Sequence, residues 1–142
     1  MLHNDAPRTA AWLIMGTTGS TPGVLEVAGD RLRFTADGRG ALTGGQLAEL
    51  ERRTGRAGLA AELERGSSVV LFEAPREAVG DVKFPWYYFG GGMKLTVFEA
   101  PYRFSFMQPQ NTQDWPGVDG IPGGRAAGRV WRAALTSAGS RS

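Results

Sequence analysis

Few side chains in this sequence could carry out nucleophilic or metal chemistry. The sequence has no cysteine and a single histidine, His3. A serine nucleophile needs a histidine to accept its proton, and zinc or transition-metal sites need several His or Cys ligands. We therefore interpret Ser67 and Ser68 as turn residues ahead of a strand. We expect no catalytic residue, no metal site and no cofactor.

Carboxylates and glycines offer the remaining chemistry. Glu73, Glu77 and Asp81 follow one another at intervals of four residues, and paired acids can share a proton or bind a hard cation. Their predicted strand-turn-strand context does not force them together, so we interpret them as solvated surface charges. The glycine-rich segment 38–44 departs by one residue from a dinucleotide fingerprint and is not followed by a βαβ unit.

Basic residues suggest contact with an anionic partner. Arg125, Arg129 and Arg132 share one side of a predicted C-terminal helix, and Lys94 lies near a predicted turn. The arginines could contact an acidic partner or anionic lipid, or they could form a solvated helix face. The net charge is only +2, which gives no strong field toward nucleic acid. We expect no nucleic-acid partner.

An aromatic segment is the second candidate for recognition. Trp86, Tyr87, Tyr88 and Phe89 precede three glycines. If this segment is extended, two of the four side chains point away from the core, which is typical of a ligand groove, a partner surface or a membrane-contacting tip. Alternatively, the aromatic rings pack beneath the helical segment or beneath Trp131.

Alternating hydrophobicity predicts a mainly β protein. We expect a tail over residues 1–10, a turn-rich connection over Gly16–Gly23 and a tail over residues 139–142, which leaves one domain over 11–138. The sequence has a short apolar run over Trp12–Met15. The predicted strands after it are Val24–Val27 and Arg31–Thr35, joined by Gly29-Asp30, then Val69–Phe72, Val79–Phe84, Met93–Val97 and Tyr102–Phe106, the last two joined by Glu99–Pro101.

Helical spacing appears in two places. Residues 44–65 predict two short helices or one broken helix, with Leu47, Leu50 and Thr54 on one stripe. Residues 125–136 predict an amphipathic helix after a long loop over 108–124. The apolar stripe of this last helix is Ala127, Val130, Trp131, Ala134 and Leu135.

The order of these elements resembles the pleckstrin-homology (PH) and GRAM superfold. The segment from Phe84 to Leu95, which reads FPWYYFGGGMKL, the strand Tyr102–Phe106 and the pattern Gly-Arg-x-x-Gly-x-x-Trp ending at Trp131 resemble an uncharacterised actinobacterial group of PH/GRAM-like proteins. The resemblance implies a partly open barrel of about seven antiparallel strands, capped by a C-terminal helix, with a short helical insertion. PH-like proteins that bind phosphoinositides generally use basic residues around the first loop between strands. The corresponding segment here, Gly16–Gly23, has no basic residue, so the resemblance does not imply phosphoinositide binding.

The resemblance implies a non-catalytic binding or adaptor module for a protein segment or a lipid-like ligand. The predicted contact residues are Trp86, Tyr87, Tyr88, Lys94, Arg125, Arg129 and Arg132, together with the groove between the last helix and a sheet edge. Self-association is a variant of this prediction. The alternative is a small-ligand carrier or small enzyme with a pocket beneath the helical insertion. We expect a cytoplasmic protein without a transmembrane segment, with peripheral membrane contact left open.

Overall fold

Seven antiparallel strands form one sheet that curls into a partly open barrel. The computed structural model describes residues 8–16, 19–84, 91–106 and 128–135. The sheet order is β4-β3-β2-β1-β7-β6-β5, so β1 joins two meanders by pairing with both β2 and β7. This confirms the predicted mainly β fold. The strands are β1 (Arg8–Met15), β2 (Gly19–Ala28), β3 (Arg31–Asp37), β4 (Ser68–Pro75), β5 (Val79–Lys83), β6 (Gly92–Val97) and β7 (Ala100–Ser105).

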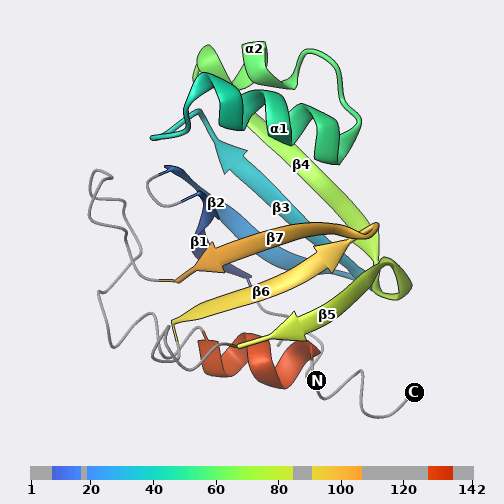
Figure 1. Ribbon diagram of the computed structural model, residues 1–142. Coiled ribbons are helices and arrows are strands. Elements are labelled where there is room, and N and C mark those ends of the chain that lie inside the picture. The colour runs from blue at the N-terminus through green and yellow to red at the C-terminus, as the bar shows by residue number, and fades with distance from the viewer. Residues whose placement is uncertain (1–7, 17–18, 85–90, 107–127, 136–142) are drawn as a thin grey trace.

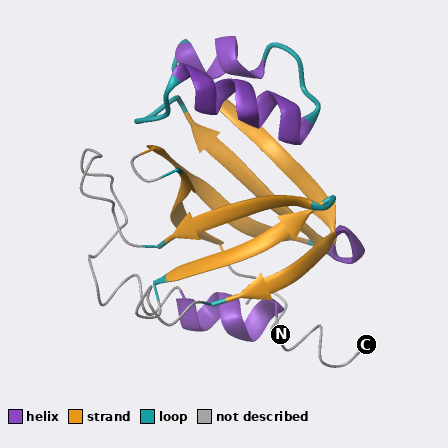
Figure 2. Cartoon of the chain, in the orientation of Figure 1, coloured by secondary structure: helices purple, strands orange, loops and turns teal. Residues whose placement is uncertain are grey.

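Helices lie over the two opposite ends of the barrel (Figures 1 and 2). Helices α1 (Gly44–Thr54) and α2 (Leu59–Glu64) connect β3 to β4 and lie over one end. The C-terminal helix, described over residues 128–135, lies at the other end. The insertion therefore forms two short helices, which is the first of the two predicted alternatives. A 3-10 helix, η2 (Arg76–Ala78), links β4 to β5.

The core is filled by alternate residues of the strands and by helix side chains. Phe34 and Phe104 meet with ring centroids 4.9 Å apart, and Phe72 and Tyr102 meet at the same distance. Such tilted pairs add to the energy of burying the rings. The period-two burial predicted for β6 and β7 is confirmed. Both inner rows are buried: Met93, Leu95, Val97, Tyr102, Phe104 and Phe106.

The C-terminal helix closes its end of the barrel through Trp131. This side chain is fully buried, and its indole N–H donates to the hydroxyl of Thr9 at 2.8 Å. Arg76 donates to the carbonyl of Ala134 at 2.9 Å, which ties the helix to η2. The predicted apolar stripe is too wide, because Val130 is 45% exposed. A helix that covers the end of a barrel presents only a narrow stripe to the core.

Two predicted boundaries near the start of the chain are wrong. Strand β1 begins at Arg8, so residues 8–10 belong to the sheet. Strand β2 begins at Gly19, within the predicted Gly16–Gly23 connection. Glycine, serine and proline carry a weak strand signal. At Gly23, however, the absence of a side chain lets the backbone lie against Phe34 of β3.

The turn between β6 and β7 begins one residue earlier, and ends two residues earlier, than predicted. Val97 pairs with Ala100, so the two turn residues are Phe98 and Glu99, and Pro101 already belongs to β7. Both turn residues have positive φ, 49° and 69°. This is the backbone of a type I′ hairpin turn, which normally selects Asn-Gly. Phe98 is also 64% exposed.

Part of the predicted binding surface lies outside the described residues. Trp86, Tyr87, Tyr88 and Arg125 belong to that part. The predicted 108–124 loop, residues 1–7 and the C-terminal tail also lie outside the described residues. Among the helices of the described residues, none is both long and apolar enough to cross a membrane.

Candidate functional site

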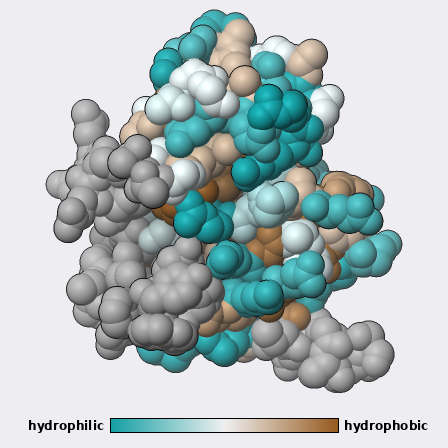
Figure 3. Space-filling view, in the orientation of Figure 1, coloured by the Kyte–Doolittle hydropathy of each residue, from teal (hydrophilic) through white to brown (hydrophobic). Residues whose placement is uncertain are grey.

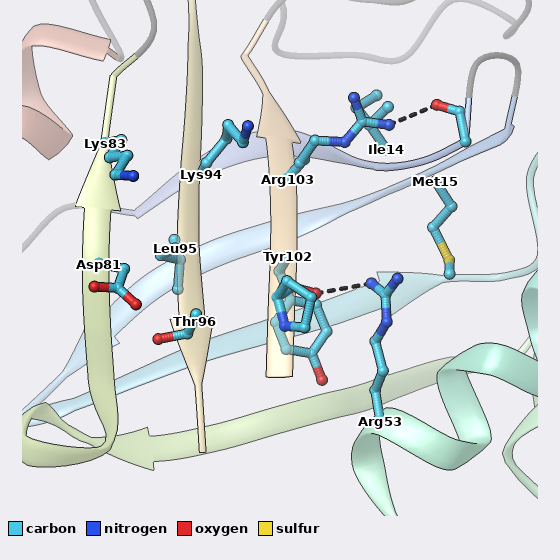
Figure 4. Close-up of a pocket in the computed structure, with 12 residues that line it drawn as sticks. Ile14, Met15, Arg53, Asp81, Lys83, Lys94, Leu95, Thr96, Tyr102 and Arg103 are labelled. Atoms are coloured by element: carbon cyan, nitrogen blue, oxygen red, sulfur yellow. Dashed lines mark hydrogen bonds between the residues drawn. The ribbon is translucent and has the colours of Figure 1, made fainter. Parts of the chain in front are cut away.

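Three basic side chains form one row across the outer face of neighbouring strands. Lys83 on β5 lies opposite Lys94 on β6, and Lys94 lies opposite Arg103 on β7. Figure 4 shows the three residues side by side. Neighbouring strands lie about 4.8 Å apart, so the row spans about 10 Å. We call these three residues the cation row.

Among the described residues, no carboxylate forms an ion pair with the cation row, although Asp81 borders it. Every ion pair between described residues joins an arginine outside the row to a glutamate. Lys83 and Lys94 are the only lysines in the sequence, and neither takes part in such a pair. Arg103 donates to the carbonyl oxygen of Gly16 at 2.5 Å, which leaves its charge in place. Like charges directly opposite in a sheet repel each other, and an anion would relieve that repulsion.

A β-bulge in β5 places Lys83 in the row. Gly80 pairs with Thr96, but Lys83 pairs with Lys94, so three steps on β5 match two on β6. Without the extra residue, the side chain of Lys83 would point to the opposite face of the sheet, because facing alternates with a period of two. Asp81 lies within the bulge and has a positive φ of 50°. Bulges commonly re-aim side chains next to binding sites.

A hollow of about 480 Å³ adjoins the cation row. It runs from Asp81 on β5 to Arg53 on α1, and Ile14, Pro101 and Tyr102 contribute to its apolar lining. This volume lies within the usual range for ligand sites. In Figure 3, hydrophilic residues cover much of this face, with apolar surface between them. The hollow therefore combines positive charge with apolar surface.

Arg53 closes the α1 end of the hollow. Its Nε donates to Glu49 at 3.0 Å, and its Nη1 donates to the carbonyl of Pro101 at 2.8 Å. The hydrogen bond from Arg53, followed by that from Arg52, lowers the pKa of Glu49 below its ordinary value. The guanidinium also lies 5.8 Å from the centre of the Tyr102 ring, and burial raises the pKa of Tyr102. Glu49 neutralises the charge of Arg53, so Arg53 bounds the hollow sterically and does not add to the positive charge of the cation row.

The predicted basic residues that the structure describes come from two different elements. Lys94 lies in the middle of β6, not at a turn, and it belongs to the cation row. Arg129 and Arg132 are exposed on the C-terminal helix and do not line the hollow. The guanidinium of Arg132 lies 4.7 Å from the ring centre of Phe84, a cation–π contact that holds the helix against the end of β5.

The predicted acidic residues do not meet at one site. Glu73 pairs with Arg33 at 3.8 Å, Glu77 lines a separate hollow beside Phe98, and Asp81 borders the cation row. Within the described ranges, no group of three or more His, Cys, Asp or Glu side chains could hold a metal ion.

Comparison with known proteins found no relative of this chain. No family model matches the chain, and no curated protein or solved structure matches it either. The cation row and its hollow therefore carry the functional argument.

Proposed function

We propose that this chain is a non-catalytic binding module of the PH/GRAM-like class, and that the cation row binds an acidic segment of a partner protein. The charge of Lys83, Lys94 and Arg103, which forms no ion pair with any carboxylate of the described segments, carries this proposal. Three cations on one rigid sheet face attract an anion and hold it in a defined register. The hollow beside them supplies apolar contact area for the rest of the segment.

The topology supports the proposed class. A partly open barrel of seven antiparallel strands, whose two meanders are joined by the pairing of β1 with β7 and which a C-terminal helix covers at one end, agrees with the architecture that the resemblance implies. A shared architecture hosts many activities, so the ligand has to be argued from the site itself.

The outer face is a better binding surface than either edge of the sheet. At one edge, Arg56 of the insertion donates to the carbonyl of Val70 on β4. At the other edge, the bulge at Asp81 interrupts β5. An occupied backbone carbonyl at one edge and a bulge at the other both hinder the addition of a further strand. We therefore place the partner on the face that carries the cation row.

The packing of the insertion favours this proposal over a carrier with its pocket beneath the helices. Leu47 and Leu50 of α1, together with Leu59 and Leu63 of α2, are almost fully buried and belong to the same cluster as the barrel core. These side chains occupy the space that such a pocket would need.

A charge-reversal experiment tests the proposal. The variant Lys83→Glu/Lys94→Glu should bind poly-L-glutamate at least about tenfold more weakly than the wild type in low-salt buffer, a change of about 1.4 kcal/mol. The matched variant Arg31→Glu/Arg65→Glu changes the net charge equally at exposed positions away from the row. It should bind as the wild type does.

Circular dichroism should first show that both variants keep the β structure. Equal loss of binding in the two variants would show that only net charge matters, and it would refute a specific site. Retained binding in the row variant would refute it as well. If vesicles containing phosphatidylserine bind through the row and poly-L-glutamate does not, the ligand is lipid-like and the protein partner is refuted.

A further inference from the structure

We infer that the cation row receives an acidic α-helix that lies across β5, β6 and β7. This inference rests on the proposed function and names the form of the partner segment. It follows from the direction of the row and from its spacing. Each cation is on a different strand, so a segment that crosses the strands runs along the row and meets the three cations one after another.

The spacing of the row matches a helix better than an extended chain. The two intervals between three neighbouring strands total about 9.6 Å. On a helix, carboxylates at i, i+4 and i+7 lie on one stripe and span about 10.5 Å of rise. In an extended chain, three residues that face the same way span about 13 Å. The mismatch is about 1 Å for the helix, which flexible lysine side chains can absorb, and more than about 3 Å for the extended chain.

The layout of the site also suits three separate carboxylates better than one compact phosphate. Sites for a compact dianion converge donors on one point, often with backbone N–H groups. Here the cations stand in a line, and the Asp81 carboxylate borders them. A phosphate at the Lys83 end would lie close to that like charge. Single carboxylates spread along the row avoid concentrating negative charge there.

Ile14 extends the row by one strand and predicts a fourth position. It lies opposite Arg103 on β1, is half-buried and lines the same hollow. A helix that crosses the four strands would place position i+11 near Ile14, since i, i+4, i+7 and i+11 share one stripe. The structure therefore predicts a partner stripe of three acidic residues followed by one apolar residue.

Three synthetic peptides of about 18 residues, long enough to form an isolated helix, test this inference. The first is alanine-rich, with Glu at i, i+4 and i+7 and Leu at i+11. The second has the same composition, with the three Glu spread around the helix. The third keeps the first pattern but carries two prolines in its middle, which break the helix. Titration calorimetry in low salt measures the affinity of the full chain for each peptide.

The stripe peptide should bind at least about tenfold more tightly than either control, which corresponds to about 1.4 kcal/mol. Its binding should disappear in Lys83→Glu/Lys94→Glu and persist in Arg31→Glu/Arg65→Glu. Replacing the peptide's Leu by Gln should weaken binding to the wild type by about two- to tenfold, because apolar burial of one side chain is lost.

The outcomes separate this inference from the proposed function. If all three peptides bind equally and the row variant loses all of them, the row binds acidic segments but the helical form is refuted. If none of the peptides binds, the acidic partner is refuted together with the helix. Inorganic pyrophosphate serves as the compact anion, and tighter binding of pyrophosphate than of the stripe peptide would overturn the linear-site argument.

Discussion

Replacing Lys94 by glutamine should stabilise this protein while weakening its binding. Lys94 is the middle member of the cation row, opposite Lys83 on one side and Arg103 on the other. The substitution removes two repulsions between neighbouring like charges. Glutamine is close to lysine in reach and leaves the strand position polar. The change in stability therefore reports mainly on charge.

The magnitude follows from the distance between the charged groups. The strands lie about 4.8 Å apart, and the flexible side chains let like charges stand slightly further apart, at about 6 Å. Two unit charges about 6 Å apart in water repel by about 0.7 kcal/mol. At physiological ionic strength the screening length is about 8 Å, which roughly halves that repulsion. Removing both repulsions should raise the free energy of unfolding by about 0.7 kcal/mol there, and by about 1 kcal/mol in low salt. For a domain of this size, about 1 kcal/mol corresponds to a rise in Tm of about 3 °C.

Urea or thermal unfolding at several salt concentrations is the assay. The difference in unfolding free energy between Lys94→Gln and the wild type should be largest at low ionic strength and should vanish near 1 M salt, where the screening length is about 3 Å. Arg31→Gln is the matched control, because the cross-strand partners of Arg31 are Ala28 and Pro75, which carry no charge. If Lys94→Gln is less stable than the wild type at low salt, the cations of the row do not repel one another as proposed. A difference in stability that does not change with salt would refute the repulsion as well.

Three further predictions concern the scaffold. Gly23→Ala should lower the free energy of unfolding by about 3 kcal/mol in urea titrations, because the added Cβ would overlap the backbone oxygen of Thr35; an unchanged midpoint would contradict the close packing of β2 on β3. The double change Phe98→Asn/Glu99→Gly should raise Tm by about 3–6 °C, since it relieves about 1–2 kcal/mol of left-handed strain in the turn; a lower Tm would show that the turn is not strained. Because the folded-state pKa of Glu49 is lowered, its stabilising contribution is present above the ordinary carboxyl value and is lost as pH falls. On acidification from about pH 5 to about pH 3, the wild type should therefore lose more Tm than Glu49→Gln does, and equal losses would argue against this pairing.

Sequence periodicity predicted most of the sheet because burial of one face leaves a period-two pattern. The strands from Val69 to Phe106 and the hairpin at Gly29-Asp30 follow that pattern. The first half of β2 does not. Its pairing depends on small residues that let the backbone approach Phe34 and Gln46 closely, and these contacts link residues far apart in the sequence.

The site was harder to predict than the fold because strand register decides it. Lys94 is recognisable as a basic residue on an outward-facing position. Lys83 lies opposite Lys94 only because of the bulge in β5, and Arg103 lies opposite Lys94 only because of the position of the two-residue turn between β6 and β7. A shift of one residue in either place would turn one of these side chains to the other face of the sheet. One signal was present in the sequence. The only two lysines flank the aromatic segment, in a chain whose other cations are arginines.

The pairing of β1 with β7 has a consequence for how this domain folds. Trp12 pairs with Ser105, so the two halves of the sheet join only when strands from opposite ends of the described chain meet. Bringing such distant segments together carries an entropic cost before any contact rewards it, and topologies rich in such pairings fold in about milliseconds to seconds. On the ribosome, β1 emerges well before its second neighbour has been made. Until β7 arrives, that edge of β1 is a place where another chain could pair.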